Sequence, residues 1–354
     1  MYRILVINPG ATSTKVAVFE DERMIISESL AHEAAVLKQF PTVWDQFEFR
    51  RQAIRTALSR WGYTEADFDV VVARGGLLKP VPGGVYRITE RMLEDARRGV
   101  QGQHVSNLGA ALAADIGEPE QTARFVVDPV SVDEFEPLAR YSGHPAIARR
   151  SLSHALNIHA VARRAAQLLG KSYEHSHWVV AHLGGGISVC PVRGGRIIDA
   201  NDAASSGPFS PERTGGLPLQ DFITLCFSGR YTESQVRRMV MGEGGLMAYL
   251  GTNDATEVEQ RIAQGDRLAH EVYQAMAYQI AKEIGAMATV LAGRVDAIIL
   301  TGGLAHSRML TSWIIARVLF IAPVMVMPGE FEMEALALGA LRVLRGEESA
   351  REYE

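Results

Sequence analysis

The chain has 354 residues, 47% of them hydrophobic and 22% charged, which is typical of a globular protein with two domains or one large one. The formal net charge of −5 argues against a global field that would attract nucleic acid or an anionic membrane. There are two cysteines and no CxxC motif, and no apolar stretch resembles a signal peptide or spans a bilayer, so we expect a soluble cytoplasmic protein. Scattered basic pairs such as Arg50–Arg51 are interpreted as solvated helix faces.

Strand and helix patterns alternate along the first half of the chain. The apolar run Ile4–Ile7 leads directly into the turn Asn8-Pro9-Gly10, and a second apolar run leaves that turn. A proline near the first turn of a helix and a glycine just past its end mark the first long helix. In chain order we predict strands at 4–7, 15–19 and 24–30, a helix between Pro41 and Gly62, a strand at 69–73, a helix at 104–116 and a strand at 124–127.

The second half continues this alternation. Its clearest helix covers 267–291, where apolar residues recur every three or four positions and form one buried stripe. Thr232 and Gln235 form a capping box at the start of a shorter helix. The other predicted elements are a helix at 153–169, a strand at 178–181, a strand after Gly186, a strand at 295–300 and a closing helix at 333–345. Such alternation predicts an α/β fold.

One short pattern occurs twice. Ile7–Gly10 and Ala181–Gly184 each lie between two predicted strands, about half the chain length apart. We therefore predict two similar domains, each with a glycine turn between adjacent strands, and a cleft between them. The first domain is predicted to contain residues 1–150 and about 336–354, and the second residues 151–335.

Three glycine-containing turns follow short apolar strands, at Asn8–Lys15, His182–Gly186 and Leu300–Leu304. Glycine lets backbone N–H groups approach an anion closely, and successive N–H groups can form an anion-binding concavity. Each turn alone is more typical of an ordinary hairpin, but the three together favour phosphate binding. The Walker motif of a P-loop is absent, and the second turn leads into a strand rather than a helix, so neither a P-loop nor a dinucleotide-binding protein is predicted.

With these turns the sequence resembles the acetokinase family. The family's first phosphate motif, N-[AP]-G-S-x-S-x-K, is matched by Asn8–Lys15. Further similar stretches follow in order along the whole chain, among them Val72–Leu78, Gly102–Asn107, Val127–Val130, Ser151–Ala155, Val180–Gly186, Gly207–Arg213, Leu300–His306 and Glu332–Leu336. The resemblance implies a duplicated fold of the actin, sugar kinase and Hsp70 type, in which each domain has a mixed β-sheet flanked by helices and the active site lies in the cleft. It also implies ATP and Mg²⁺ as cofactors, reversible phosphoryl transfer to the carboxylate of a short fatty acid, and a homo-oligomer, dimer or larger.

The resemblance also implies roles for individual residues. Phosphate contacts of the nucleotide would come from Asn8, Gly10, Ser13, Lys15, His182, Gly184, Gly185, Gly186, Gly302 and Gly303. Asn8, Asp128 and Glu334 would position Mg²⁺, directly or through water. Asp128, His154, His182, Arg74 and Arg213 would be the catalytic set.

Such a reaction needs no general base, because a carboxylate is already ionised at neutral pH. It does need alignment and charge cancellation between two anions. We expect Arg74 and Arg213 to clamp the acid and the transferring phosphoryl group, because guanidinium pairs with both bidentately. His154 and His182 would donate hydrogen bonds to that phosphoryl group.

The sequence departs from the family pattern at three places. Ala11 replaces a serine of the first motif, Arg74-Gly-Gly stands where acetate kinases have His-Gly-Gly, and Asn201–Gly207 contains a single acid, Asp202. Arg74-Gly-Gly and Glu332-Met-Glu resemble the members of the family that act on butyrate, and this resemblance favours butyrate as the acid. Acetate, propionate and isobutyrate stay open as alternatives.

Less specific interpretations also stay open. Asp128 precedes a proline and is typical of a strand-end turn, while Glu334 is typical of an acidic residue near a helix N-terminus. A histidine near a strand end is more often structural than catalytic. The alternative of another class is a non-catalytic nucleotide-binding module of the actin or Hsp70 type, which would bind ATP without forming an acyl phosphate.

Overall fold

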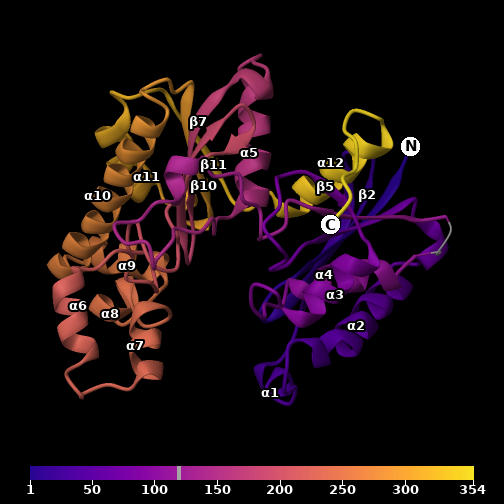
Figure 1. Ribbon diagram of the computed structural model, residues 1–354, viewed down its shortest axis with the longest axis horizontal. Coiled ribbons are helices and arrows are strands. Elements are labelled where there is room, and N and C mark those ends of the chain that lie inside the picture. The colour runs from indigo at the N-terminus through magenta and orange to yellow at the C-terminus, as the bar shows by residue number, and fades with distance from the viewer. Residues whose placement is uncertain (118–120) are drawn as a thin grey trace. The chain divides into compact units, whose positions relative to one another are not determined.

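The computed structural model describes residues 1–117 and 121–354. Contacts within the chain divide it into two compact units, each a sheet covered by helices (Figure 1). Unit 1 contains Met1–Asp133, Ala155–Asn157 and Phe331–Glu354, and unit 2 contains Glu134–His154 and Ile158–Glu330. The chain therefore returns to unit 1 for its last helix. Within the described ranges no helix is both long and apolar enough to cross a membrane.

Unit 1 is built on a six-stranded mixed sheet with the strand order β3-β2-β1-β4-β6-β5. The first three strands form an antiparallel meander, whereas β4 pairs in parallel with β1 and β6 in parallel with β4. The strands are β1 (Arg3–Pro9), β2 (Ser13–Glu20), β3 (Arg23–Ala31), β4 (Val70–Arg74), β5 (Val85–Arg87) and β6 (Ala123–Val127).

Helices cover both faces of this sheet. On one face Leu5 of β1 packs in a cluster with Ile54 of α2 and Leu108 of α4. On the other face α12 packs against β1, β4 and β6 (Figure 1). A Cβ on Gly339 of α12 would meet Val127 at 2.8 Å, so glycine lets this helix close onto β6. The helices are α1 (Ala34–Leu37), α2 (Phe47–Arg60), α3 (Glu90–Arg98), α4 (Asn107–Asp115) and α12 (Glu332–Leu344).

Unit 2 repeats this plan with five strands in the order β11-β10-β7-β8-β9. β7, β8 and β9 form an antiparallel meander, and β10 pairs in parallel with both β7 and β11. The strands are β7 (His177–Leu183), β8 (Ile187–Arg193), β9 (Arg196–Ile197), β10 (Ala297–Gly302) and β11 (Val324–Pro328).

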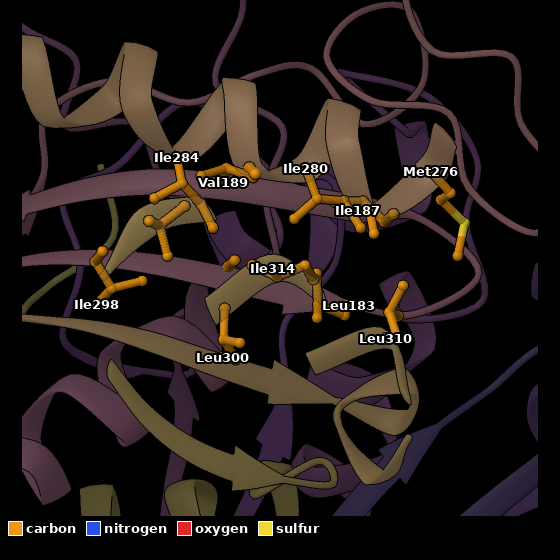
Figure 2. Packing of buried hydrophobic residues seen from close by; sticks show 14 of the residues in the cluster. Leu183, Ile187, Val189, Met276, Ile280, Ile284, Ile298, Leu300, Leu310 and Ile314 are labelled. Atoms are coloured by element: carbon orange, nitrogen blue, oxygen red, sulfur yellow. The ribbon is translucent and has the colours of Figure 1, made fainter. Parts of the chain in front are cut away.

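The core of unit 2 lies between this sheet and two helices. Met276, Ile280 and Ile284 of α10 project toward Ile187 and Val189 of β8, and α11 fills the neighbouring space (Figure 2). The four-residue spacing of those apolar side chains puts them on one face of α10. The helices are α5 (Ala155–Leu168), whose first three residues belong to unit 1, and α6 (Leu219–Cys226), α7 (Glu233–Val240), α8 (Gly245–Leu250), α9 (Ala255–Ala263), α10 (Arg267–Val290) and α11 (Arg308–Val318).

The predicted duplicated α/β fold is confirmed. Each sheet starts with a meander whose first connection contains a glycine turn, between β1 and β2 and between β7 and β8, and continues with parallel strands. The capping box of Thr232 and Gln235 is present at the start of α7. The helix expected from Pro41 begins only at Phe47, because a bend and one short 3-10 turn precede it.

Candidate functional site

In unit 1 the predicted residues gather at one edge of the sheet. β1, β4 and β6 are neighbouring parallel strands, so their carboxyl ends lie at the same edge. Asn8 lies near the end of β1, Arg74 ends β4, and Asp128 follows β6. Ligands of open α/β sheets bind outside the carboxyl ends of the strands. This edge is the candidate site in unit 1.

A buried carboxylate joins two of these residues. Glu332, the first residue of α12, is 6% exposed and accepts a hydrogen bond from Nδ2 of Asn8 at 2.7 Å. Nη1 of Arg74 donates to the same carboxylate at 3.1 Å. Charge-assisted bonds of this kind are short and directional. The contact therefore holds both side chains in fixed orientations at the strand ends.

The sequence analysis selected Glu334, whose role stays a prediction, and gave no role to Glu332, which the structure places in contact with Asn8 and Arg74. Glu334 is half-buried, and no hydrogen bond or ion pair of its carboxylate is found among residues 1–117 and 121–354. Two positions apart on a helix, the two carboxylates cannot face the same partner. The motif Glu332-Met-Glu contains both acids. The rotation of α12 about its axis determines which of them points toward Asn8 and Arg74.

Asp128 has a defined partner at the same edge. Its backbone φ is 39°, which is uncommon for a residue other than glycine, and its side chain is buried. Oδ1 accepts a hydrogen bond from the N–H of Gly84 at 2.7 Å. The carboxylate therefore ties the end of β6 to the loop before β5, which agrees with the interpretation of Asp128 as a turn residue and leaves its part in catalysis a prediction.

The first glycine turn brings four predicted residues together. The N–H of Gly10 donates to the carbonyl of Ser13 at 2.8 Å and closes the turn between β1 and β2. Asn8 and Lys15 lie opposite each other in the antiparallel register. Directly opposite residues share one face of a hairpin, so the side chains of Lys15 and Asn8 leave the sheet on the same face.

His104 lies close to Arg74, although the sequence analysis gave it no role. Burial of the imidazole, and then the positive charge of Arg74, lower its pKa. Nδ1 lies 2.6 Å from Oγ of Ser106. His104 belongs to the stretch Gly102–Asn107 that resembles the family, so that stretch was the signal that could have found it.

In unit 2 two predicted histidines stack on each other. His182 lies in β7 and His154 directly precedes α5. Their ring centroids are 3.9 Å apart and the ring planes differ by 11°. Nδ1 of His154 lies 3.0 Å from Oγ of Ser188, which is paired with His182 across β7 and β8. The stack and the serine contact fix the orientation of both rings.

Arg213 lies against the second glycine turn. Its Nη1 is 2.5 Å from the place where a Cβ on Gly186 would be, so glycine is needed for this approach. Nη1 donates to the carbonyl of Ala203 at 3.2 Å, while Nε is buried and has no hydrogen bond in the described part of the chain. The hydroxyl of Ser210 donates to the carbonyl of Gly185 at 2.5 Å. The segment before Arg213 is thereby fixed to the turn.

The third glycine turn lies beside the second. β10 pairs in parallel with β7, and Thr301 lies opposite His182. Gly302 has a φ of 89°, and a Cβ on it would collide with the carbonyl of Leu183. Gly303 opens a short 3-10 helix that leaves this edge. The turns of Gly184–Gly186 and Gly302–Gly303 therefore share the carboxyl edge of the sheet in unit 2.

The segment Asn201–Gly207 is a structural connection. The carboxylate of Asp202 accepts hydrogen bonds from the N–H of Ala204 at 2.9 Å and from the hydroxyl of Ser205 at 2.6 Å. The side chain of Asn201 accepts from the N–H of Val189 at 2.6 Å. The single acid of this segment is therefore used in a local turn.

The donor set in unit 1 fits a magnesium ion that is held jointly with a nucleotide. Mg²⁺ prefers oxygen ligands, keeps several waters and usually takes one or two carboxylates together with phosphates. Asn8 and Glu332 supply an amide and a carboxylate at one strand edge. No group of three or more His, Cys, Asp or Glu residues that could hold a metal occurs among residues 1–117 and 121–354.

Comparison with known proteins gives concordant results. Residues 139–322 match the model of the acetokinase family. The chain is 49% identical over 353 residues to a protein of Clostridium acetobutylicum named butyrate kinase 2, with 99% of each chain covered. It is 50% identical over 353 residues to a probable butyrate kinase 2 of Caldanaerobacter subterraneus, with 100% of each covered. The crystal structure of Porphyromonas gingivalis acetate kinase matches with a TM-score of 0.80 at 17% identity, covering 97% of this chain and 100% of that one, which shows a shared fold.

Proposed function

This chain belongs to the acetokinase family, as its motifs predicted, and from that premise we propose that it is a butyrate kinase. It transfers the γ-phosphoryl group of ATP reversibly to the carboxylate of butyrate and gives butyryl phosphate and ADP. The observation that carries this proposal is the identity of about half of all residues, over the full length, with proteins named butyrate kinase or probable butyrate kinase.

Arg74 is the proposed binder of the acid. Glu332 engages Nη1, and no other hydrogen bond of this guanidinium is found in the described ranges. Nε and Nη2 thus leave a planar edge that can pair with a carboxylate. Because Glu332 fixes the group in advance, little orientational entropy is lost when the acid binds.

The charge of the transferring phosphoryl group is the proposed target of Arg213, His154 and His182. All three are held by neighbours, Arg213 on Gly186 and the two rings by stacking. Donors that are fixed before the reaction stabilise developing charge without reorganisation. The three glycine turns, with Gly10, Ser13 and Lys15 in the first, are the proposed contacts of the ATP phosphates.

Magnesium would be positioned by Asn8, Asp128 and Glu332, and Glu332 takes the role that the sequence analysis gave to Glu334. The ion, when bound, neutralises phosphate charge during transfer. Neither the ion nor its water shell is needed to explain the orientation of Asn8, which its hydrogen bond to Glu332 already fixes.

Hydroxamate trapping tests the function. Acetate, propionate, butyrate, isobutyrate and longer acids up to C6 are each incubated with ATP, Mg²⁺ and hydroxylamine. We expect acyl hydroxamate to form with the highest kcat/KM for butyrate. Each added or missing methylene group should lower kcat/KM by about 10- to 200-fold. A higher value for another acid would reassign the substrate. If the protein binds ATP but forms no hydroxamate with any acid, the butyrate kinase proposal fails and the non-catalytic nucleotide-binding module becomes the better interpretation.

We also propose that the protein forms a homo-oligomer through the apolar face of α6. Leu219 is 73% and Ile223 49% exposed, and Phe227 just after the helix is 87% exposed. Their four-residue spacing puts them on one face, and identical apolar faces pair readily between two copies. Phe227→Asp should lower the mass in sedimentation analysis, whereas Leu168→Asp, at another exposed leucine, should not. A cytoplasmic location stays the prediction made from composition.

A further inference from the structure

Arg50 is a wholly buried cation, and none of residues 1–117 and 121–354 gives it a carboxylate partner. The sequence analysis interpreted Arg50–Arg51 as a solvated pair, and this is wrong for Arg50, which is 0% exposed. Its neighbour Arg51 does lie at the surface and pairs with Glu48 and Asp115. No acid lies within ion-pair distance of Arg50 among the residues that the structure describes. Arg51 therefore forms surface ion pairs, whereas Arg50 lies in the interior of the protein.

The guanidinium of Arg50 binds the inner side of the first glycine turn. Nη1 donates to the carbonyls of Gly10 and Ser13 and to Oγ1 of Thr14, each at 3.0 Å. Nη2 donates to the carbonyl of Ala11 at 3.3 Å. Both Nε and Nη2 are anchored on Oε1 of Gln46, one turn earlier in the chain, at 3.1 and 2.9 Å. One side chain thus holds the acceptors of almost the entire turn.

These contacts determine where the N–H groups of the turn point. In a planar trans peptide the carbonyl of one residue and the N–H of the next point in opposite directions. Arg50 draws the carbonyls of Gly10 and Ala11 inward, so the N–H groups of Ala11 and Thr12 point away from it. Successive N–H groups that point outward form an anion-binding concavity.

The positive charge of Arg50 favours anion binding at the turn, as the orientation of the N–H groups does. Burial lowers the pKa of the guanidinium to about 10, so it stays protonated at neutral pH. His32, which shares Thr14 with Arg50, is neutral there, because burial and then Arg50 lower its pKa to about 4. A buried cation that no carboxylate neutralises stabilises an anion bound on the other side of the turn.

We propose that Arg50 is a positioning residue for the phosphate-binding turn Gly10–Ser13. It orients the outward N–H groups and supplies positive charge beneath them, without touching substrate itself. This inference rests on the proposed function only in that the bound anion is taken to be a phosphate of ATP. It also explains how the turn binds phosphate with Ala11 at the serine position of the family, because the fixed backbone supplies the donors there.

Matched arginine variants test the proposal. Arg50→Met removes the charge and all donors. Arg50→Lys keeps the charge and a compact ammonium donor but removes the planar guanidinium that bridges the turn and Gln46. Arg51→Met and Arg51→Lys are the controls on the same helix. We expect kcat/KM for MgATP to fall about 100-fold in Arg50→Met and about 10-fold in Arg50→Lys, while the KM for butyrate changes less than about 3-fold. The Arg51 variants should keep the wild-type value of kcat/KM for MgATP.

A second variant covers the case in which Arg50→Met does not fold. Gln46→Met removes the anchor of the guanidinium on a half-buried residue and should lower kcat/KM for MgATP about 3- to 10-fold with the circular dichroism spectrum unchanged. Wild-type values in both Arg50→Lys and Gln46→Met, or an equal rise in the KM for butyrate, would overturn the proposal.

Calorimetric binding of ADP and of inorganic phosphate separates this inference from the proposed function. If the wild-type protein forms no butyryl phosphate, the function fails. If Arg50→Lys nevertheless weakens phosphate or ADP binding about 10-fold while Arg51→Lys does not, the inference about Arg50 stands. Equal binding by both variants and the wild type would remove Arg50 from this role.

Discussion

Two glutamates at the start of α12 differ in burial and in the partners of their carboxylates. Glu332 is buried and bonded to Asn8 and Arg74, whereas Glu334 has no hydrogen-bond or ion-pair partner in the described ranges. Glu332→Gln keeps the shape but removes the charge that orients the guanidinium of Arg74. We expect kcat to fall by about 10²-fold and the Mg²⁺ concentration at half-maximal rate to rise.

Glu334→Gln is the comparison for this prediction. Since its side chain lies on another side of the helix, it should change kcat by less than about 3-fold. Steady-state rates across a Mg²⁺ titration measure both variants. A larger loss in Glu334→Gln than in Glu332→Gln would return the role to the residue that the sequence favoured.

The neutral imidazole of His32 makes stability depend on pH. Burial and then Arg50 lower its pKa to about 4, from the ordinary value of 6.5 for an exposed ring. Between these two values the unfolded chain binds more protons than the folded one, so stability is complete above about pH 6.5 and decreases as the pH falls toward 4. As the pH falls from 6.5 to 4, the free energy of unfolding should decrease by about 1–3 kcal/mol less in His32→Gln than in the wild type. Urea unfolding at several pH values measures this difference. His175→Gln, at an exposed histidine, should follow the wild-type curve.

At the scale of the elements, glycines decide how closely a neighbour can approach a turn. A Cβ on Gly186 would lie 2.5 Å from Nη1 of Arg213, so Gly186→Ala must displace that guanidinium. Because the backbone φ of Gly186 is not in the left-handed region, the fold should tolerate the change. We expect kcat to fall about 10²-fold with a small change in melting temperature.

Gly143→Ala is the matched control, because nothing lies within 4 Å of a Cβ at that position. Its kcat and melting temperature should both equal those of the wild type. If Gly186→Ala also kept the wild-type kcat, Arg213 would not need its position on the turn, and its proposed contact with the phosphoryl group would have to be abandoned.

The same elements show what a sequence can and cannot reveal. The strand ends and glycine turns were predictable because turn chemistry and hydrophobic periodicity are local properties. Which of Glu332 and Glu334 contacts Asn8 and Arg74 depends on the phase of α12 against β1 and β4. The burial of Arg50 depends on how α2 packs under the turn of β1 and β2. Both are decided by packing between distant segments, so neither leaves a local pattern in the sequence.

For the whole molecule, the C-terminal segment Phe331–Glu354 returns to unit 1 and packs against strands from the start of the chain. The C-terminal helix α12 packs on β1, β4 and β6, and Leu336 is fully buried there. Unit 2 has a separate core, in which Ile284 of α10 is fully buried. Each unit contains its own sheet and its own apolar cluster, and domains of this kind can unfold separately.

Truncation of either core residue should therefore destabilise one unit more than the other. Leu336→Ala and Ile284→Ala each remove about 2–5 kcal/mol of stability. Hydrogen exchange followed by mass spectrometry should show faster exchange in peptides of β1, β4 and β6 for Leu336→Ala, and in peptides of β7, β8 and β10 for Ile284→Ala. Because Leu336 also supports the helix that carries Glu332, only its variant should raise the KM for butyrate. Equal acceleration of exchange in both units by either variant would mean that the two cores unfold as one cooperative unit.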